Sequence, residues 1–330
     1  MFDLLLFCRP DKLLFCQGDK GKEAGNFCYP RGLAINQEGD IIVADTDNHR
    51  IQIFNQSCLL KLTIGSKGKA DGKFNQPSAV AVFESQDIAV ADWKNKRVQV
   101  FYPSGKFKYG FKTINEPFSI ACDKDFNVII GTTKRTVEIY TRQGSLSHNW
   151  QTGELMRPPS MVWVHSSPAG RKEVILSDAA DQMVKFFSYK GQLLYKFRPT
   201  AGIDSVACHI GAVTVTDEDQ ILIPDTLNHT VNLYSERGLL LDQVLTPLDE
   251  CGSVQACRVG PEGHIVALEF TANGPHCLKL FRFHECECHR TRPGSSRKKS
   301  ETSSSRVSTP ASSSDISIPE YEPDFDDNDI

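Results

Sequence analysis

Hydrophobic residues along the chain gather in short runs, and polar or glycine-containing turns separate these runs. Ile41–Val43 and Ile51–Ile53 are typical, and β-branched residues dominate both. The turn between such runs changes its sequence freely from place to place but keeps residues that favour turns. This alternation of short apolar runs and turns predicts an all-β fold.

The runs form an internal repeat. Residues 29–54 align with residues 76–101 without a gap, because every matched position is offset by 76 − 29 = 47. Four further copies keep the hydrophobic frame. Asp45 corresponds to positions 92, 132, 178, 225 and 269, so a unit of about 45 residues occurs six times.

Each unit contains strand-like runs in a fixed order. In four of the units an aromatic residue ends the third run and a glycine follows four positions later, as in Phe101 and Gly105. Glycine takes the positive φ of a tight hairpin, so a fourth strand is expected after it. Four strands in each of six units predict a six-bladed β-propeller over residues 1–289. Lys12–Gly18 resembles the fourth-strand segment Leu59–Gly65, so we expect the N-terminal strand to close the ring.

Composition and charge narrow the setting. The 330-residue chain has a formal net charge of −4, so no global basic field favours non-specific nucleic-acid binding. Its 11 cysteines are spread thinly, which favours free thiols and a cytoplasmic or nuclear protein. The apolar run Leu4–Cys8 is too short to cross a membrane, and no membrane partner is expected. Residues 290–330 are Ser-rich, first basic and then acidic, so we expect a disordered tail.

The first two units carry a longer motif. Residues 30–54 contain a Pro-x-Gly start, then Val-Ala-Asp, then Asn-His-Arg before the third run, and residues 77–101 keep most of it. This motif resembles the NHL repeat, and the resemblance covers roughly residues 11–283. It implies a propeller of the kind found in tripartite-motif and malin-type E3 ubiquitin ligases, and the last unit looks closest to the malin type.

The same resemblance implies a RING zinc module ahead of the propeller. Such a module needs paired Cys and His ligands at C-x2-C-type spacing. The cysteines that precede the first repeat are too few and wrongly spaced for it: Cys8, Cys16 and Cys28. We therefore expect this chain to lack its own ligase chemistry.

The turn after the repeated Asp is the most polar part of the first three units. Equivalent loops of a propeller share one face, so these side chains are expected to form a basic arc. The arc consists of His49, Arg50, Trp93, Lys94, Lys96, Arg97, Lys134 and Arg135. Basic side chains beside an exposed aromatic ring suit single-stranded RNA. The alternative is that each repeated Arg folds back on the repeated Asp as a structural pair, while the lysines are merely solvated.

Three other groups of residues contain side chains of the kinds found in metal sites or active sites. One carboxylate recurs in each unit, which favours turn capping over metal binding: Asp45, Asp92, Asp178 and Asp225. The expected inner strands, the fifth at residues 206–209, are apolar except for His209, Gln255 and some thiols. Four zinc-type ligands fall within a six-residue segment, closer than a usual zinc site allows: His284, Cys286, Cys288 and His289. We expect no metal and no cofactor.

These patterns together predict a non-enzymatic interaction propeller. The family resemblance implies that it recognises a protein substrate or adaptor of the ubiquitin pathway, for protein turnover in the cytoplasm. An RNA-binding regulator that uses the basic arc is the alternative hypothesis. An enzyme with a metal in the propeller channel is a third. The sequence identifies neither the partner nor the oligomeric state.

Overall fold

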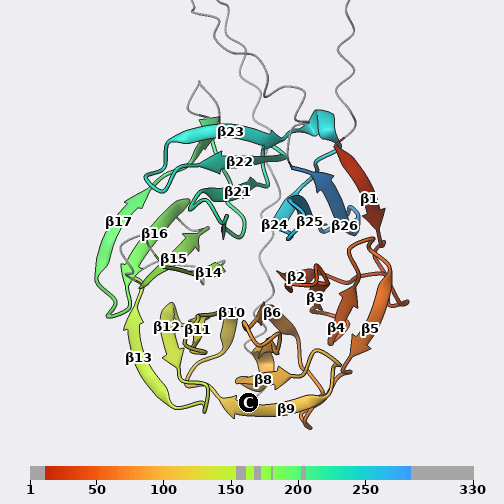
Figure 1. Ribbon diagram of the computed structural model, residues 1–330, viewed down its shortest axis with the longest axis vertical. Coiled ribbons are helices and arrows are strands. Elements are labelled where there is room, and N and C mark those ends of the chain that lie inside the picture. The colour runs from red at the N-terminus through yellow and green to blue at the C-terminus, as the bar shows by residue number, and fades with distance from the viewer. Residues whose placement is uncertain (1–11, 154–160, 167–171, 180, 202–205, 284–330) are drawn as a thin grey trace, which may run out of the picture. The chain divides into compact units, whose positions relative to one another are not determined.

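The computed structural model describes residues 12–153, 161–166, 172–179, 181–201 and 206–283. Six four-stranded antiparallel sheets are arranged around a central axis, which Figure 1 views end-on. The six-bladed propeller expected from the repeat is confirmed. Residues 290–330, expected to form the tail, lie outside the described residues.

Blades 1 to 3 have the same strand order from the innermost strand to the outermost. Blade 1 contains β2 to β5, at Pro30–Ile35, Ile41–Asp45, Arg50–Phe54 and Leu60–Ile64. Blade 2 contains β6 to β9, at Pro77–Val82, Ile88–Asp92, Arg97–Phe101 and Phe107–Lys112, with the 3-10 helix η1 at Trp93–Asn95. Blade 3 contains β10 to β13, at Pro117–Cys122, Val128–Thr132, Thr136–Tyr140 and Leu146–Gln151.

The remaining blades vary this plan. Blade 4 contains β14 to β17, at Met161–Ser166, Lys172–Asp178, Met183–Ser188 and Leu193–Phe197. Blade 5 contains β20 to β23, at Thr214–Val215, Ile221–Asp225, Thr230–Tyr234 and Leu240–Leu245. Blade 6 contains β24 to β26, at Val254–Val259, His264–Phe270 and His276–Arg282, after the 3-10 helix η2 at Pro247–Asp249. Neither helix in the described part of the chain has the length or apolar character that a bilayer crossing requires.

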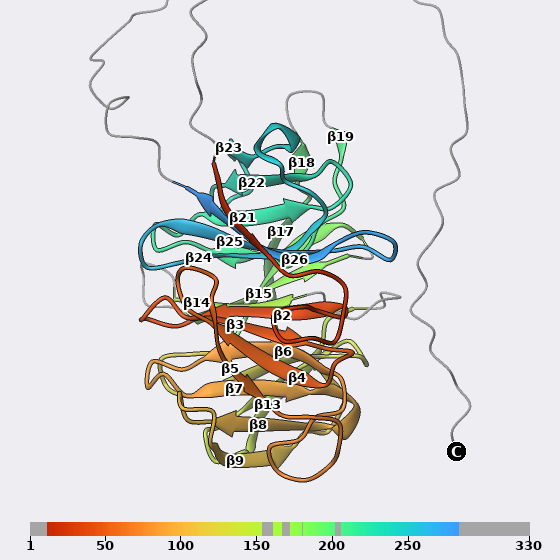
Figure 2. The same ribbon diagram turned by 90° about the vertical axis from the view of Figure 1, so that its right-hand side faces the viewer.

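The ring is closed by the N-terminal strand, as the sequence predicted. β1, at Leu13–Gln17, is the outermost strand of blade 6 and pairs antiparallel with β26. In this pairing Cys16 faces Lys279, and the Arg282 N–H donates to the Lys12 carbonyl at 2.8 Å. Figure 2 shows the red β1 lying against the blue β26. The backbone groups on that edge of β26 are thereby satisfied within the chain.

Apolar side chains pack each blade onto the next. The rings of Phe27 and Phe54 lie 5.7 Å apart, and the equivalent rings of Phe74 and Phe101 lie 5.6 Å apart. These four side chains are almost completely buried. One repeated aromatic pair therefore fills the same space in blades 1 and 2.

The hairpin before the outermost strand has the predicted backbone conformation. Gly105 has a φ of +80°, as a tight turn requires of its glycine. In blade 1 the corresponding residue is Cys58, which adopts a φ of +57° with a buried side chain. The turn geometry is therefore kept where the glycine is not.

The inner strand of blade 5 lies later in the chain than the sequence analysis placed it. The expected segment 206–209 is wrong, because Val206–Ala207 (β19) pairs with Thr200–Ala201 (β18) in a separate two-stranded ladder. The inner strand is β20, where Val215 faces Ile221. Blades 1 to 3 mark this strand with a proline at its start, and blade 5 has Ile210 at that place. Without the proline, no local signal fixes the register.

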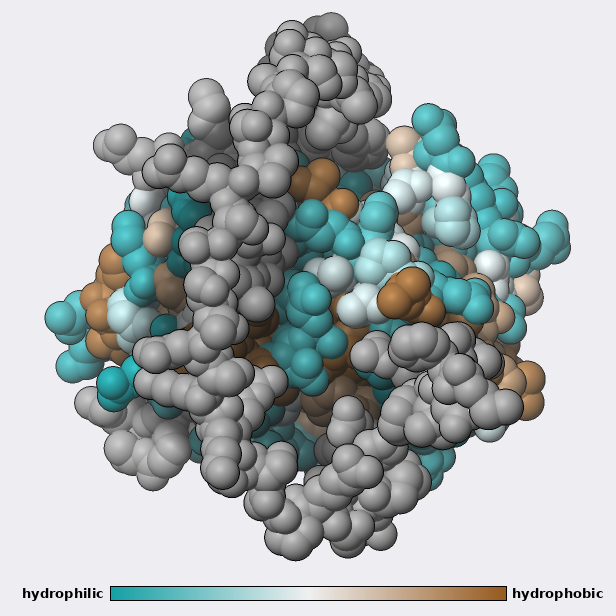
Figure 3. All heavy atoms as spheres, turned by 90° about the horizontal axis from the view of Figure 1, so that it is seen from above, coloured by the Kyte–Doolittle hydropathy of each residue, from teal (hydrophilic) through white to brown (hydrophobic). Residues whose placement is uncertain are grey.

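Exposed leucines are concentrated on the outer rim. They include Leu193 and Leu194 in β17, Leu239 and Leu241 at β23, and Leu248 in η2. Figure 3 looks from above onto the described part of the rim near β23, where brown apolar residues are interspersed among teal hydrophilic ones. Scattered apolar residues of this kind are ordinary on outer strands.

Candidate interaction surface

The repeated Asp of blades 1 and 2 is the centre of a buried polar network. Asp45 Oδ2 accepts a hydrogen bond from Arg50 Nε at 2.7 Å, and Asp45 Oδ1 accepts one from the Cys28 N–H at 2.7 Å. In blade 2, Asp92 Oδ2 accepts from Arg97 Nε, also at 2.7 Å. Both carboxylates are 0% exposed. Such burial is tolerable only because each carboxylate is both paired and hydrogen-bonded.

The two arginines also hold the connection that enters each blade. Arg50 Nη2 donates to the carbonyls of Glu23 and Asn26 at 2.7 and 2.8 Å. Arg97 Nη2 makes the equivalent bonds to the carbonyls of Ala70 and Lys73, at 2.9 and 2.8 Å. The Arg50 and Arg97 side chains are 12% and 15% exposed. The geometry therefore favours the structural pair over the RNA-binding role for these two arginines.

In blade 3, different residues form the polar contacts at the position of the repeated Asp. Thr132 replaces the Asp and shares a 2.6 Å hydrogen bond with Thr136, which stands in place of Arg50 and Arg97. The buried Glu138 accepts from the Tyr140 hydroxyl and from Asn115 Nδ2, both at 2.7 Å. An uncharged pair thus occupies the positions of the Asp and the Arg. The carboxylate of blade 3 belongs instead to Glu138, two residues after Thr136 in β12.

The carboxylates of the later blades also have structural partners. Asp178 Oδ2 lies 2.8 Å from Lys185 Nζ, Asp225 accepts from Asn228 Nδ2 at 2.6 Å, and Glu269 lies 2.9 Å from Lys279 Nζ. Among the described residues, no cluster of three or more His, Cys, Asp or Glu side chains could hold a metal ion. The zinc-type ligands His284, Cys286, Cys288 and His289 lie outside those residues.

In blades 1 to 5, one residue of this turn adopts a left-handed backbone just before the third strand. These residues and their φ values are His49 at +55°, Lys96 at +51°, Arg135 at +59°, Gln182 at +56° and His229 at +54°. His49 Nδ1 accepts from the Gln76 N–H at 2.9 Å, which links blade 1 to blade 2. Gln182 Oε1 likewise accepts from the Ile210 N–H at 2.8 Å and links blade 4 to blade 5.

The same turn position carries a cation in blades 2 and 3. Lys96 and Arg135 have no acceptor atom in their side chains, so they cannot make the link that His49 and Gln182 make. The turn of blade 3 is one residue shorter than that of blade 2. Arg135 for this reason corresponds to Lys96 and not to the structural Arg97. Lys96 Nζ lies 4.0 Å from a Glu116 carboxylate oxygen and is largely exposed.

Three lysines of these two turns point to solvent. Lys94, Lys96 and Lys134 are exposed, whereas Arg135 is half-buried. Lys94 Nζ lies 4.2 Å from the centre of the Trp93 ring. The three lysines of adjacent blades are the part of the predicted basic arc that is available to a partner, and we call them the lysine surface.

The expectation of an exposed aromatic ring in the arc is wrong. Trp93 is only 8% exposed, and its ring packs edge-on against Phe118 at 5.4 Å between centroids. Trp93 begins η1 directly after Asp92, so the one-turn helix directs the ring inward against blade 3. A base cannot stack on this ring without displacing its neighbours.

The half-buried His49 has a pKa that burial shifts. Burial lowers the pKa of His49 below its ordinary value of 6.5, and Lys67 adds to that effect. The neutral ring keeps Nδ1 available as the acceptor for the Gln76 N–H. His49 therefore belongs to the joint between blades 1 and 2 and not to the lysine surface.

Comparisons with known proteins support the repeat assignment. Residues 27–54 and 74–101 match the family described as NHL repeat. A 39-residue stretch, 12% of this chain, is 54% identical to the B-box type zinc finger protein ncl-1 of Caenorhabditis elegans and 56% identical to the protein brain tumor of Drosophila melanogaster. That stretch spans 5% and 4% of those two proteins. The similarity confirms NHL repeats, and the malin-type assignment goes beyond it.

Solved structures share the architecture. The RRP9 WD40 repeats align with a TM-score of 0.57 at 12% identity, covering 77% of this chain and 94% of that one. A virginiamycin B lyase from Staphylococcus aureus aligns with a TM-score of 0.56 at 10% identity, covering 78% and 85%. At such identities the likeness shows the propeller fold alone.

Proposed function

We propose that this chain is a non-enzymatic interaction propeller that recognises an acidic protein surface through Lys94, Lys96 and Lys134. The observation that carries this proposal is the contrast between turns. Blades 1 and 4 use the left-handed turn residue as a joint to the next blade, whereas blades 2 and 3 place cations there. Lys96 reaches Glu116 ahead of the next blade only through a solvent-exposed ion pair of 4.0 Å, which contributes little to stability. Because all three lysines are exposed, a binding role explains their presence better than a folding role.

The finer proposal concerns the fate of the partner. The resemblance to NHL propellers of ubiquitin ligases supports a role in selecting a protein substrate or adaptor for ubiquitin-dependent turnover. We place this activity in the cytoplasm, with the nucleus as the alternative. The thin spread of the 11 cysteines along the chain is what supports a reducing compartment.

RNA remains the competing ligand for the same surface. Three lysines would contact phosphates well, because such contacts need only positive charge. Single-stranded RNA usually also needs aromatic rings for base stacking, and the Trp93 ring is packed against Phe118. This packing favours a protein partner over RNA.

Turnover measurements in cells test the function. The full chain is captured from RNase-treated lysate, and the lifetimes of the captured proteins are compared in cells with and without the chain, with and without a proteasome inhibitor. We expect at least one captured protein to be ubiquitinated and to live longer when the chain is absent. Loss of all partners on RNase treatment would establish the RNA alternative, and unchanged lifetimes of every partner would refute the turnover role.

A further inference from the structure

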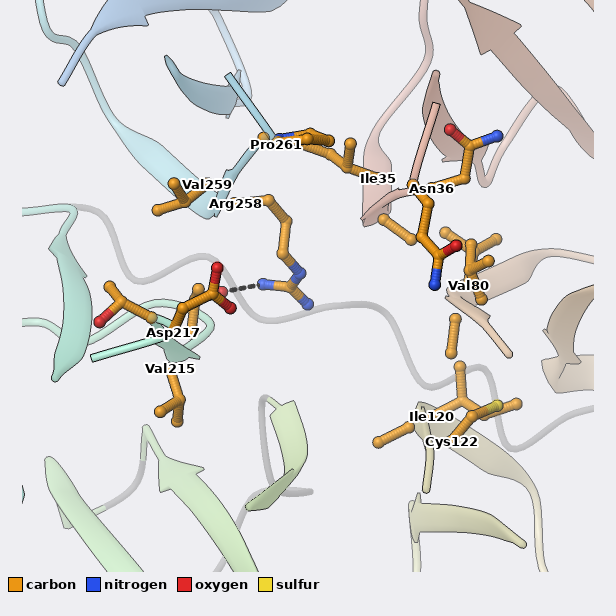
Figure 4. A pocket seen from close by; sticks show the side chains of 18 residues that line it. Ile35, Asn36, Val80, Ile120, Cys122, Val215, Asp217, Arg258, Val259 and Pro261 are labelled. Carbon is orange, nitrogen blue, oxygen red and sulfur yellow. Dashed lines mark hydrogen bonds between the residues drawn. The ribbon is translucent and has the colours of Figure 1, made fainter. Parts of the chain in front are cut away.

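A cavity of about 410 Å³ lies where the inner strands of five blades converge. Its wall is formed by the ends of β2, β6, β10, β20 and β24 and by the turns that follow some of them. Most of the wall is apolar, with Ile35, Val82, Ile120 and Val259 among its residues. In Figure 4 the guanidinium of Arg258 points from β24 into this space.

The register of the inner strands shows that Arg258 stands out among its counterparts. Arg258 faces Val266 in the second strand of its blade, one position before the end of the inner strand. The residues at the same register in blades 1 to 5 are Ala34, Ala81, Ala121, Trp163 and Thr214. Arg258 is the cation among these six positions, and the three alanines leave space at the axis beside it.

The position of the guanidinium is fixed by its neighbours. Arg258 is 6% exposed, and its Nη1 donates to Thr214 Oγ1 and to the Cys257 carbonyl, the latter at 2.8 Å. Thr214 Oγ1 in turn donates to the same carbonyl at 2.7 Å. Burial lowers the pKa of Arg258 to about 10, which still leaves the group charged at neutral pH. A charged, planar donor is thus held in place at the wall of a cavity that is lined by apolar side chains and, at its turns, by polar ones such as Asn36 and Gln37.

We propose that this cavity binds an organic carboxylate, with the acid group on Arg258 and an aliphatic body against Ile35, Val82 and Ile120. A planar guanidinium matches a carboxylate in geometry and charge, and the low-dielectric surroundings strengthen the interaction. The apolar walls favour an aliphatic ligand over a hydrophilic one. The carboxylate can belong to the C-terminus of a peptide or to a free small acid. The site is independent of the lysine surface.

Asp217 is the charged neighbour that opposes this site. It lines the same cavity from the turn after β20, and in Figure 4 its carboxylate lies on the same side as the Arg258 guanidinium. Asp217 is exposed, so water screens its charge more than that of Arg258. Its removal should leave acid binding at least as strong.

Calorimetric titration of the full chain tests the proposal with two pairs of probes. The first pair is 4-methylpentanoate and its amide, and the second is an acetylated tripeptide ending in leucine, with a free carboxylate or a carboxamide. We expect binding of at least one acid and at least a tenfold weaker affinity for its amide. Binding of both acids identifies a general carboxylate site, whereas binding of the peptide acid alone identifies a chain terminus as the ligand.

Variants assign the binding to the cavity. Arg258→Met should weaken acid binding at least tenfold, and Asp217→Asn should not weaken it. The acid–amide comparison uses the unchanged protein, so it decides the matter even if Arg258→Met fails to fold. The proposal is overturned if neither acid binds at millimolar concentration, if acid and amide bind equally, or if folded Arg258→Met binds the acid as the parent chain does.

Discussion

Blade 3 is equivalent to blades 1 and 2 in the ring, but different residues form the hydrogen bonds of its buried turn. In blade 2 the charged pair Asp92–Arg97 fixes the entering connection. In blade 3, Thr132 pairs with Thr136, and Glu138 takes its bonds from Tyr140 and Asn115. The difference shows that the buried polar groups of this turn need hydrogen-bond partners, and that different residue types can supply them. The repeated arginines of the motif are therefore part of the scaffold, and the cations beside them are not.

Breaking the charged network should give the largest effect. Asp92→Ala leaves Arg97 Nε and the Asn75 N–H without their acceptor. We expect it to lower the free energy of unfolding by about 3 kcal/mol, because it removes one partner of a buried pair. Urea unfolding of the two proteins measures this loss. A loss below about 1 kcal/mol would show that the network contributes little.

The network of blade 3, in which Thr132 and Thr136 replace the Asp–Arg pair, should respond less strongly. Tyr140→Phe removes the hydroxyl that donates to Glu138 and accepts from the Ile114 N–H. The expected loss of unfolding free energy is about 2 kcal/mol, the range for buried polar groups left without a partner. Blades 1 and 2 have Phe54 and Phe101 at this place, so Phe itself fits the position. A neutral outcome in the same urea assay would mean that Glu138 is satisfied without Tyr140.

The joint between blades 1 and 2 should be sensitive to pH. Since burial lowers the pKa of His49 from its ordinary 6.5, the unfolded chain binds this proton more readily than the folded one. Stability should therefore fall as the pH drops through about 6.5. Gln182 performs the same task in blade 4 with an amide oxygen that does not titrate.

His49→Gln separates the hydrogen bond from the charge. We expect it to change stability by less than about 1 kcal/mol at neutral pH, because an acceptor for the Gln76 N–H remains. It should also remove part of the decline in melting temperature between about pH 7.5 and about pH 5.5. An identical decline in both proteins would contradict the role given to His49.

The lysine surface should have the smallest effect on stability. The triple variant K94E/K96E/K134E changes exposed side chains outside the buried networks, so we expect unfolding free energy to shift by no more than about 0.5 kcal/mol. Urea unfolding beside Asp92→Ala gives the direct comparison. A loss as large as that of Asp92→Ala would place these lysines in the scaffold.

The repeat made the fold predictable from the sequence. The constant offset of 47 residues relates two equivalent blades, and the Lys12–Gly18 segment contains the strand that closes the ring. The site was harder to predict. The exposed fraction of Trp93 depends on Phe118 in the next blade, and no property of its own turn shows this. The position of Arg135 in its turn follows from a turn that is one residue shorter than that of blade 2, so Arg135 matches Lys96. The sequence around Arg258 does not indicate its site, because the cavity is formed by inner strands far apart in the sequence, where alanines take the same register.

The central claim is that Lys94, Lys96 and Lys134 bind a protein partner while Arg50 and Arg97 hold the blades. The most direct test is quantitative capture from RNase-treated lysate by the parent chain, by K94E/K96E/K134E and by K106E/K124E/K190E. The last variant makes the same charge change on exposed lysines of turns at the opposite ends of the strands. The account predicts a salt-sensitive partner that is lost only in K94E/K96E/K134E. Equal retention by all three proteins, or equal loss in both variants, would contradict it.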